Sequence, residues 1–308
     1  MAMNQRVILA GGSGFVGRSL TPLLAAAGYE IVVLSRRPTS PGNGATSLAW
    51  DGKTLGHWTK CLEGAAAVVN LTGRSINCRH TPENRRLIIE TRVDSVRVLG
   101  QAIAQAAQPP IAFVQAAAVG IYGDAGDRWC DEEAPHGHDF VAESCERWEA
   151  AFHEVAASQT RKVLLRLGVV LGPDGGFLKV LSKLTRLFLG GQAGNGRQFI
   201  SWIHQADLGR MFQEAIEKPE MAGVFNATSP NPVSNTEFMR ELRRTLRRPW
   251  SPPVPEFAVR IGSRLLGTEA RLALASQRAV PRRFLEQGFR FEFPELSPAL
   301  EDLLHASR

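Results

Sequence analysis

Tyrosine and cysteine are scarce in this chain, which holds two tyrosines and four cysteines among 308 residues. The cysteines are too few and too scattered for a disulfide framework, so we expect reduced thiols in a cytoplasmic protein. Two of them lie near two histidines, but the spacing of Cys130, His136, His138 and Cys145 matches no usual zinc pattern. The sequence therefore predicts no metal site.

Long hydrophobic runs are also missing, since none approaches the roughly 20 residues that span a bilayer. The first apolar run begins so early that it leaves no room for a signal peptide. We accordingly expect no membrane partner. The net charge of +6 suggests nucleic acid, but the densest arginine groups, at 240–248 and 278–283, lack interleaved aromatic residues. We expect no nucleic-acid partner, and either a monomer or a homodimer.

A glycine-rich loop follows the apolar run Val7–Ala10. The loop is succeeded by a segment with helical spacing, 20–27, and by a second β-branched run, 31–34. Strand, glycine loop, helix and strand in this order suit a dinucleotide pyrophosphate, which needs a tight turn, close backbone approach and a free helix N-terminus. The predicted cofactor-binding residues here are Gly11, Gly12, Ser13, Gly14, Phe15, Val16 and Gly17.

The end of the second strand indicates which dinucleotide is bound. An NAD site usually has an Asp or Glu there, whereas this chain has Ser35, Arg36 and Arg37. Two guanidinium groups would neutralise and bind a 2′-phosphate that a carboxylate would repel. We therefore predict NADP(H) as the cofactor and NAD(H) as the alternative. The two arginines could instead be a solvated strand end.

Alternation of strands and helices predicts an α/β fold, a Rossmann-type doubly wound parallel sheet. The dinucleotide-binding domain is expected at 1–172, with residues around 199–227 returning to it. A smaller, mostly helical C-terminal substrate domain is expected at 173–308. The predicted strands are 6–10, 30–35, 47–50, 67–71, 111–117 and 162–170, and the main helices 83–105 and 140–157.

Several further motifs are similar to those of one superfamily. They include Asn70–Gly73, Val119–Gly123, Arg166–Gly172, Gly196–His204, Asn226–Val233, Gln277–Pro281 and Gly288–Phe291. On these residues the chain resembles an atypical extended short-chain dehydrogenase/reductase, of the "epimerase family" that has a C-terminal domain of unknown function. The motifs span nearly the whole chain.

The carboxyl ends of parallel strands form the ligand site in such folds. Leu71, Thr72 and Gly73 are expected beside the cofactor ribose, and Arg92 within reach of a phosphate or ribose. An exposed helical arginine is the alternative for Arg92. From the segment that borders the substrate in extended relatives, we expect Arg197, Gln198, Trp202 and His204 to contact a small molecule. His204 could instead satisfy backbone groups where a helix begins near Asp207.

The resemblance also implies a Ser/Tyr/Lys catalytic set, and this chain lacks it. No lysine lies between Lys60 and Lys162. Aligning the helix on Glu149 puts Val141 and Cys145 in the tyrosine and lysine positions, and the serine position falls within 116–118, which are all alanine. The catalytic residues are therefore unknown.

Two functions remain open. The first is an NADP(H)-binding, epimerase-like oxidoreductase of unknown substrate, with a nucleotide sugar as one substrate class and Tyr122 as the first candidate proton donor. The second is a non-catalytic NADP(H)-binding redox sensor or regulatory protein.

Overall fold

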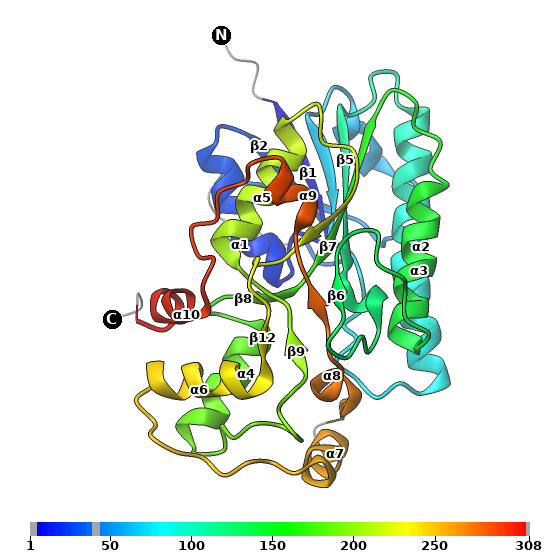
Figure 1. Ribbon diagram of the computed structural model, residues 1–308. Helices are drawn as coiled ribbons and strands as arrows, with labels where there is room; N and C mark the ends of the chain where they lie inside the picture. The colour runs from blue at the N-terminus through cyan, green and yellow to red at the C-terminus, as the bar shows by residue number, and fades with distance from the viewer. Residues whose placement is uncertain (1–4, 39–43, 266, 306–308) are drawn as a thin grey trace.

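A seven-stranded parallel sheet forms the centre of the molecule (Figure 1). The structure is a computed structural model that describes residues 5–38, 44–265 and 267–305. The strands run in the order β11-β7-β5-β4-β1-β2-β3, with the order reversing between β1 and β4. Their bounds are β1 Arg6–Ala10, β2 Glu30–Ser35, β3 Thr46–Ala49, β4 Ala67–Asn70, β5 Ala112–Ala118, β7 Arg161–Leu167 and β11 Gly223–Ala227. The predicted doubly wound fold is confirmed.

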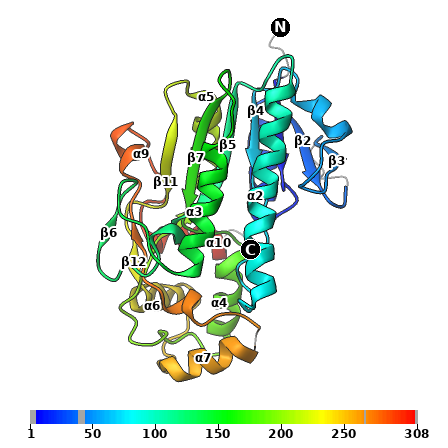
Figure 2. The same ribbon diagram turned by 90° about the vertical axis from the view of Figure 1, so that its right-hand side faces the viewer.

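Helices cover both faces of this sheet. On one face lie the long helices α2 (Pro82–Gln105) and α3 (Phe140–His153), side by side in Figure 2, with the short helix η1 (His57–Leu62) nearby. On the other face lie α1 (Phe15–Ala26) and α5 (Gln205–Glu217). Helix α9 (Arg282–Glu286) packs on the same face. Placing apolar residues on both faces explains why the central strands read as continuous hydrophobic runs.

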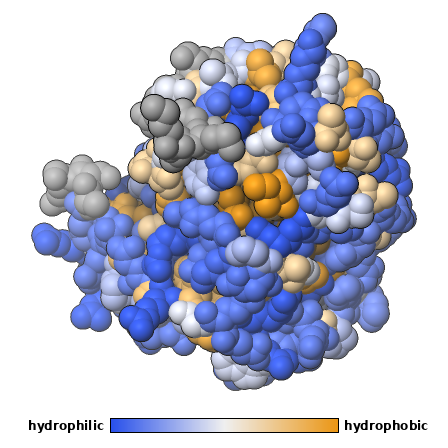
Figure 3. Space-filling view, turned by 90° about the horizontal axis from the view of Figure 1, so that it is seen from above, coloured by the Kyte–Doolittle hydropathy of each residue, from blue (hydrophilic) through white to orange (hydrophobic). Residues whose placement is uncertain are grey.

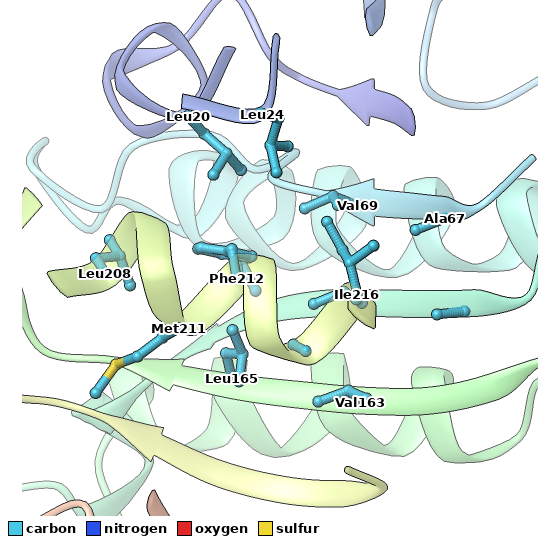
Figure 4. Packing of buried hydrophobic residues seen from close by; sticks show 14 of the residues in the cluster. Leu20, Leu24, Ala67, Val69, Val163, Leu165, Leu208, Met211, Phe212 and Ile216 are labelled. Atoms are coloured by element: carbon cyan, nitrogen blue, oxygen red, sulfur yellow. The ribbon is translucent and has the colours of Figure 1, made fainter. Parts of the chain in front are cut away.

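The larger of the two sheet-covering cores lies beneath α1 and α5. Figure 4 shows Leu20 and Leu24 of α1 facing Phe212 and Ile216 of α5, with Val69 of β4 beside them and Leu165 of β7 on the far side of α5. Phe212 has no exposed surface. The later chain joins the same core, because Phe284 and Phe289 pack into it although they follow the expected domain boundary at 172 by more than a hundred residues.

A smaller C-terminal unit lies below the carboxyl edge of the sheet (Figure 1). Its core is built around Trp202 and Phe238. Its strands are β8 Val169–Leu171, β9 Phe199–Ile200, β10 Trp202–His204 and β12 Val233–Ser234, and its helices α4 Gly176–Arg186, α6 Asn235–Thr245, α7 Glu256–Leu265, α8 Arg271–Leu274 and α10 Leu296–His305. A two-stranded pair, β6 Trp129–Cys130 and β13 Arg278–Ala279, ties it to the sheet region.

Removing the ring of Phe212 should test the contribution of α5 to the sheet core. We expect Phe212→Ala to lower the free energy of unfolding by about 3–5 kcal/mol, because a large buried ring is replaced by a cavity. The neighbouring change Gln213→Ala, on a partly exposed side chain, should cost less than about 1 kcal/mol. Chemical denaturation of the three proteins measures both values, and equal midpoints would contradict the packing described.

Candidate dinucleotide-binding site

The glycine loop between β1 and α1 is closed so tightly that side chains do not fit at two positions. A Cβ at Gly17 would lie 2.3 Å from the carbonyl oxygen of Gly12, and one at Gly12 would lie 2.8 Å from Leu9 Cβ. Gly11 has φ +75°, a left-handed conformation that favours glycine. These contacts let the backbone approach a ligand closely and bring the start of α1 to the loop.

The N-terminus of α1 suits an anion. Gly14 is the N-cap, no side chain caps the helix, and its first turn holds no acidic residue. The first N–H groups of a helix have no partner within the helix and carry its positive end. The loop therefore offers backbone donors and no competing carboxylate where the pyrophosphate is predicted.

Phe15 connects this loop to the C-terminal unit. Its ring packs on a second glycine-rich turn, since Cβ atoms at Gly172 and Gly175 would lie 2.8 and 2.6 Å from its ring carbons. This turn leads from β8 into α4. Phe15 therefore fixes how the C-terminal unit approaches the cofactor loop, in addition to its predicted place beside the cofactor.

Arg36 and Arg37 lie at the carboxyl end of β2, next to the glycine loop, because Gly11 N donates to Leu34 O over 2.9 Å. Both are exposed, and within the described part of the chain neither forms an ion pair. Ser35 Oγ donates to Arg37 O over 2.8 Å and so shapes the turn between them. The two guanidinium groups are available to an anionic ligand.

The loop after β4 is held by a buried amide. Asn70 Nδ2 donates to Gln115 Oε1 over 2.9 Å, and its Oδ1 accepts from Thr72 N over 3.0 Å. Thr72 Oγ1 is buried without a hydrogen-bond partner and lies 3.0 Å from the position of a Cβ at Gly11. A hydroxyl without a partner, beside a cradle without side chains, fits a bound dinucleotide. Leu71 and Gly73 flank it.

Arg92 holds the same loop from α2. Its Nη1 donates to the carbonyl oxygen of Arg74 over 2.9 Å, and its guanidinium carbon lies 4.9 Å from the centre of the Trp148 ring. Burial lowers the pKa of Arg92. It is thus not a solvated helical arginine, and contact with a phosphate or ribose stays a prediction.

The positions of the catalytic set meet at the carboxyl end of β5 and carry no acid or base. A Cβ at Gly120 would lie 2.8 Å from Val141 Cγ1 and 3.7 Å from Cys145 Sγ. Gly120 belongs to the short helix η2 (Val119–Tyr122), which directly follows the alanines of β5. Burial raises the pKa of the Cys145 thiol to about 12, so it stays protonated at neutral pH.

Tyr122 is fully buried and has a structural role. Its hydroxyl lies 2.7 Å from Asn226 Oδ1 and accepts from Arg166 Nη1 over 3.0 Å. Burial raises the pKa of Tyr122 to about 12. Arg166 in turn donates two hydrogen bonds, of 2.9 and 2.8 Å, to the buried carboxylate of Glu149. A hydroxyl fixed in such a network does not reach a substrate.

The four residues expected at the substrate do not line one surface. Trp202 has no exposed surface, and its Nε1 donates to Asn231 O over 3.0 Å in the core of the C-terminal unit. Gln198 is also buried and donates to Ala193 O and Ala273 O. Arg197 is exposed to solvent. Residues that look like a cluster in the sequence therefore point in different directions.

His204 caps helix α5. This agrees with the alternative that it satisfies backbone groups where a helix begins near Asp207. Its Nδ1 accepts from Ala206 N over 3.1 Å at the start of α5, and its ring lies 3.9 Å from that of Phe293. Burial lowers the pKa of His204, although Asp302 at 3.3 Å opposes this shift. The ring is therefore held in its neutral form within the protein.

Asn70 and Phe15 show what the sequence could and could not signal about this site. Asn70 belongs to the motif Asn70–Gly73, but only the fold shows that its amide fixes the loop through Gln115. The contact of Phe15 with Gly172 and Gly175 joins segments more than 150 residues apart and has no sequence signature. The buried pair of Arg166 and Glu149 was likewise not predicted.

The doubly wound fold and the glycine loop at the carboxyl edge of its sheet define a Rossmann-type dinucleotide-binding protein. Residues 7–227 match the NAD dependent epimerase/dehydratase family, and residues 254–303 match a domain of unknown function, DUF1731. The chain belongs to this epimerase/dehydratase family, as its motifs predicted.

Relatives match along almost the whole chain. An "epimerase family protein SDR39U1 homolog, chloroplastic" of Arabidopsis thaliana is 36% identical over 97% of this chain and 86% of its own length. The epimerase family protein SDR39U1 of Bos taurus is also 36% identical, over 97% of this chain and 99% of its own. The crystal structure of human SDR39U1 (isoform 2) with NADPH superimposes with a TM-score of 0.87 at 33% identity, covering 97% of this chain and 99% of that one.

Two substitutions at His204 should separate a cap from a ligand contact. Asparagine is a good N-cap and alanine a poor one, so His204→Ala should be about 1 kcal/mol less stable than His204→Asn at pH 7.5. NADPH affinity should change by less than about twofold in both, since the side chain faces the C-terminal core. Denaturation and calorimetric titration measure these values; a loss of NADPH affinity in a folded variant would contradict the placement of the side chain away from the cofactor.

His204 should also make the free energy of unfolding decrease as the solution becomes acidic. Because its folded pKa lies below the unfolded value of 6.5, the unfolded chain binds a proton more readily, and unfolding becomes easier as pH falls through that range. The decrease in unfolding free energy between pH 7.5 and 5.5 should be smaller in His204→Asn than in the unmodified protein. Equal decreases would contradict the lowered pKa.

Proposed function

We propose that this protein binds NADP(H) at the carboxyl edge of its sheet and does so without the tyrosine–lysine proton relay of its superfamily. The observation that carries the proposal is the cradle formed by Gly11, Gly12 and Gly17 beside the unpartnered Thr72 hydroxyl. The NADPH complex of the human relative supports the choice of cofactor. When bound, NADP(H) supplies a hydride donor or acceptor.

The chain's own residues divide the binding between them. The glycine loop and the first turn of α1 would hold the pyrophosphate through backbone N–H groups. Arg36 and Arg37 would hold the 2′-phosphate, and the loop Leu71–Gly73, with Arg92 behind it, would border a ribose. Each of these groups lies at the carboxyl edge, and none requires a rearrangement of the sheet.

Bound NADP(H) could serve two functions. Burial of Trp202, Gln198 and His204 within the protein removes the expected substrate side chains and favours a redox sensor or regulatory role. Membership of the epimerase/dehydratase family favours an oxidoreductase acting on a small molecule, with a proton donor other than Tyr122. Of the two, we favour the sensor, because Val141 and Cys145 leave the catalytic positions without an ionisable group at neutral pH.

Two further expectations remain proposals. We infer that the protein is a monomer or a homodimer. We also infer that its partner is a small molecule and not a nucleic acid. We also propose a cytoplasmic location; one relative is named as chloroplastic.

Replacing the two arginines should remove the preference for NADPH. A charge-assisted hydrogen bond contributes about 1.5–3 kcal/mol, so Arg36→Ala with Arg37→Ala should weaken NADPH binding at least tenfold. NADH affinity should stay constant because NADH lacks the 2′-phosphate. Arg86→Ala, an exposed arginine on α2, is the matched control. Calorimetric titration decides, and a variant that still binds NADPH as tightly as the control would contradict this role.

Turnover of nucleotide sugars should be slow or absent. General acid–base catalysis normally contributes about 100- to 10,000-fold, and the positions that would supply it hold valine, cysteine and alanine. A panel of UDP- and GDP-sugars, assayed for epimerisation beside a conventional epimerase, should give no rate above background with this protein. Rapid turnover of one of them would overturn the sensor role and leave the cofactor assignment intact.

A further inference from the structure

Helix α7 presents its bulky apolar side chains to solvent. Phe257, Ile261 and Leu265 recur every four residues along one stripe, and their side chains are 67%, 57% and 83% exposed. The half-buried residues of the helix include Ala258 and Val259, and none is fully buried. A helix of a globular protein normally turns its apolar stripe to the core. In α7 this orientation is inverted.

A second exposed apolar segment lies next to the connector that leads into α7. Leu187, Phe188 and Leu189 are each more than half exposed, as is Trp250. The segments are adjacent because the Arg248 guanidinium lies 5.0 Å from the centre of the Phe188 ring. Val254 N also donates to Gln192 O over 2.8 Å. Together, residues 187–189, Trp250 and the outward stripe of α7 form what we call the apolar surface.

Positive charge is concentrated around the apolar surface. The segments 176–190 and 235–265, which contain α4, α6 and α7, hold ten lysines and arginines and three acidic residues. Their net charge of +7 exceeds the +6 of the whole chain. Figure 1 shows these helices together at the lower end of the molecule, whereas Figure 3 shows the opposite end covered mainly by hydrophilic residues with several small hydrophobic groups among them.

We propose that the apolar surface docks on an anionic phospholipid bilayer. A helix with exposed Phe, Ile and Leu beside Arg264, and beside Arg260 in its pair with Glu256, suits the interface, where apolar side chains enter the acyl boundary and cations meet anionic headgroups. An exposed apolar patch of this kind marks an interaction site. The cationic rim selects a negatively charged partner, and the apolar stripe selects one with an accessible hydrocarbon layer.

Such docking does not need a membrane-spanning segment. Among the described residues no helix is long and apolar enough to cross a bilayer. The expectation of no membrane partner came from the lack of such a run in the sequence and does not bear on a helix that lies at the surface. The proposal is independent of the cofactor, since α7 contributes nothing to the glycine loop.

Vesicle sedimentation with the full chain tests the proposal. Vesicles of phosphatidylcholine with 30% phosphatidylglycerol, about a third anionic, should retain at least tenfold more protein than vesicles of phosphatidylcholine alone. The triple variant Phe257→Ser, Ile261→Ser, Leu265→Ser should lose this binding. Ile111→Ser is the matched control, because Ile111 is 57% exposed beside β5 and outside the apolar surface. Circular dichroism of each variant shows whether it is folded.

Three outcomes would overturn the proposal. The first is no sedimentation of the unmodified protein with anionic vesicles. The second is equal binding by the triple variant and the control. The third is a concentration-dependent dimer that the triple variant abolishes in the absence of vesicle binding, which would assign the apolar surface to a second copy of the chain. Loss of binding on reversing charge in Lys179→Glu, Lys183→Glu, Arg186→Glu would support the proposal.

Discussion

The contact between Gly17 and the carbonyl oxygen of Gly12 is the constraint on which the site depends. No side chain fits between α1 and the loop at this point, since a Cβ at Gly17 would lie 2.3 Å from that oxygen. The close approach brings the N-terminus of α1 to the end of β1, where the strand order reverses. On the other side of the same turn, the ring of Phe15 packs against the loop that leads into α4. Cofactor loop and C-terminal unit therefore meet at one rigid corner.

The chain keeps the backbone shape of an epimerase-like site, but the buried polar side chains beside that site form hydrogen bonds that stabilise the fold. Arg166 is buried, which alone would lower its pKa, but the hydrogen bonds with Glu149 raise it. The pair leads to Tyr122 and on to Asn226, and so links β7, α3, η2 and β11. Removing one partner of a buried ion pair costs several kcal/mol. This network fixes the end of the sheet and holds the Tyr122 hydroxyl away from a catalytic role.

Local patterns in the sequence predicted most of the sheet and the cofactor loop. The strands at 6–10 and 30–35 and the helix beginning at Phe140 agree with the structure, because periodicity and turn residues decide them locally. The strand predicted at 162–170 is instead divided. A Cβ at Gly168 would lie 2.7 Å from Ser201 O, and beyond this point β8 leaves the sheet to pair with β10. Such a tertiary contact cannot be read from one segment.

The substrate side was the least predictable part for the same reason. Arg197, Trp202 and His204 lie close in sequence, but strand alternation and a helix start send their side chains to solvent, to a core and to a cap. The contacts of His204 matched only the alternative that a helix start had suggested. Residue types in a motif indicate capability, whereas burial decides which of them can meet a ligand.

Titrating NADPH into the protein and two glycine variants tests the central claim most directly. Gly17→Ala places a methyl group against the Gly12 carbonyl, whereas Gly262→Ala on α7 meets no atom within 4 Å. The account predicts that the first variant remains folded by circular dichroism and loses at least tenfold in NADPH affinity, on the order of 1.4 kcal/mol, while the second binds as the unmodified protein does. A folded Gly17→Ala protein with unchanged affinity would show that the cofactor does not depend on this loop.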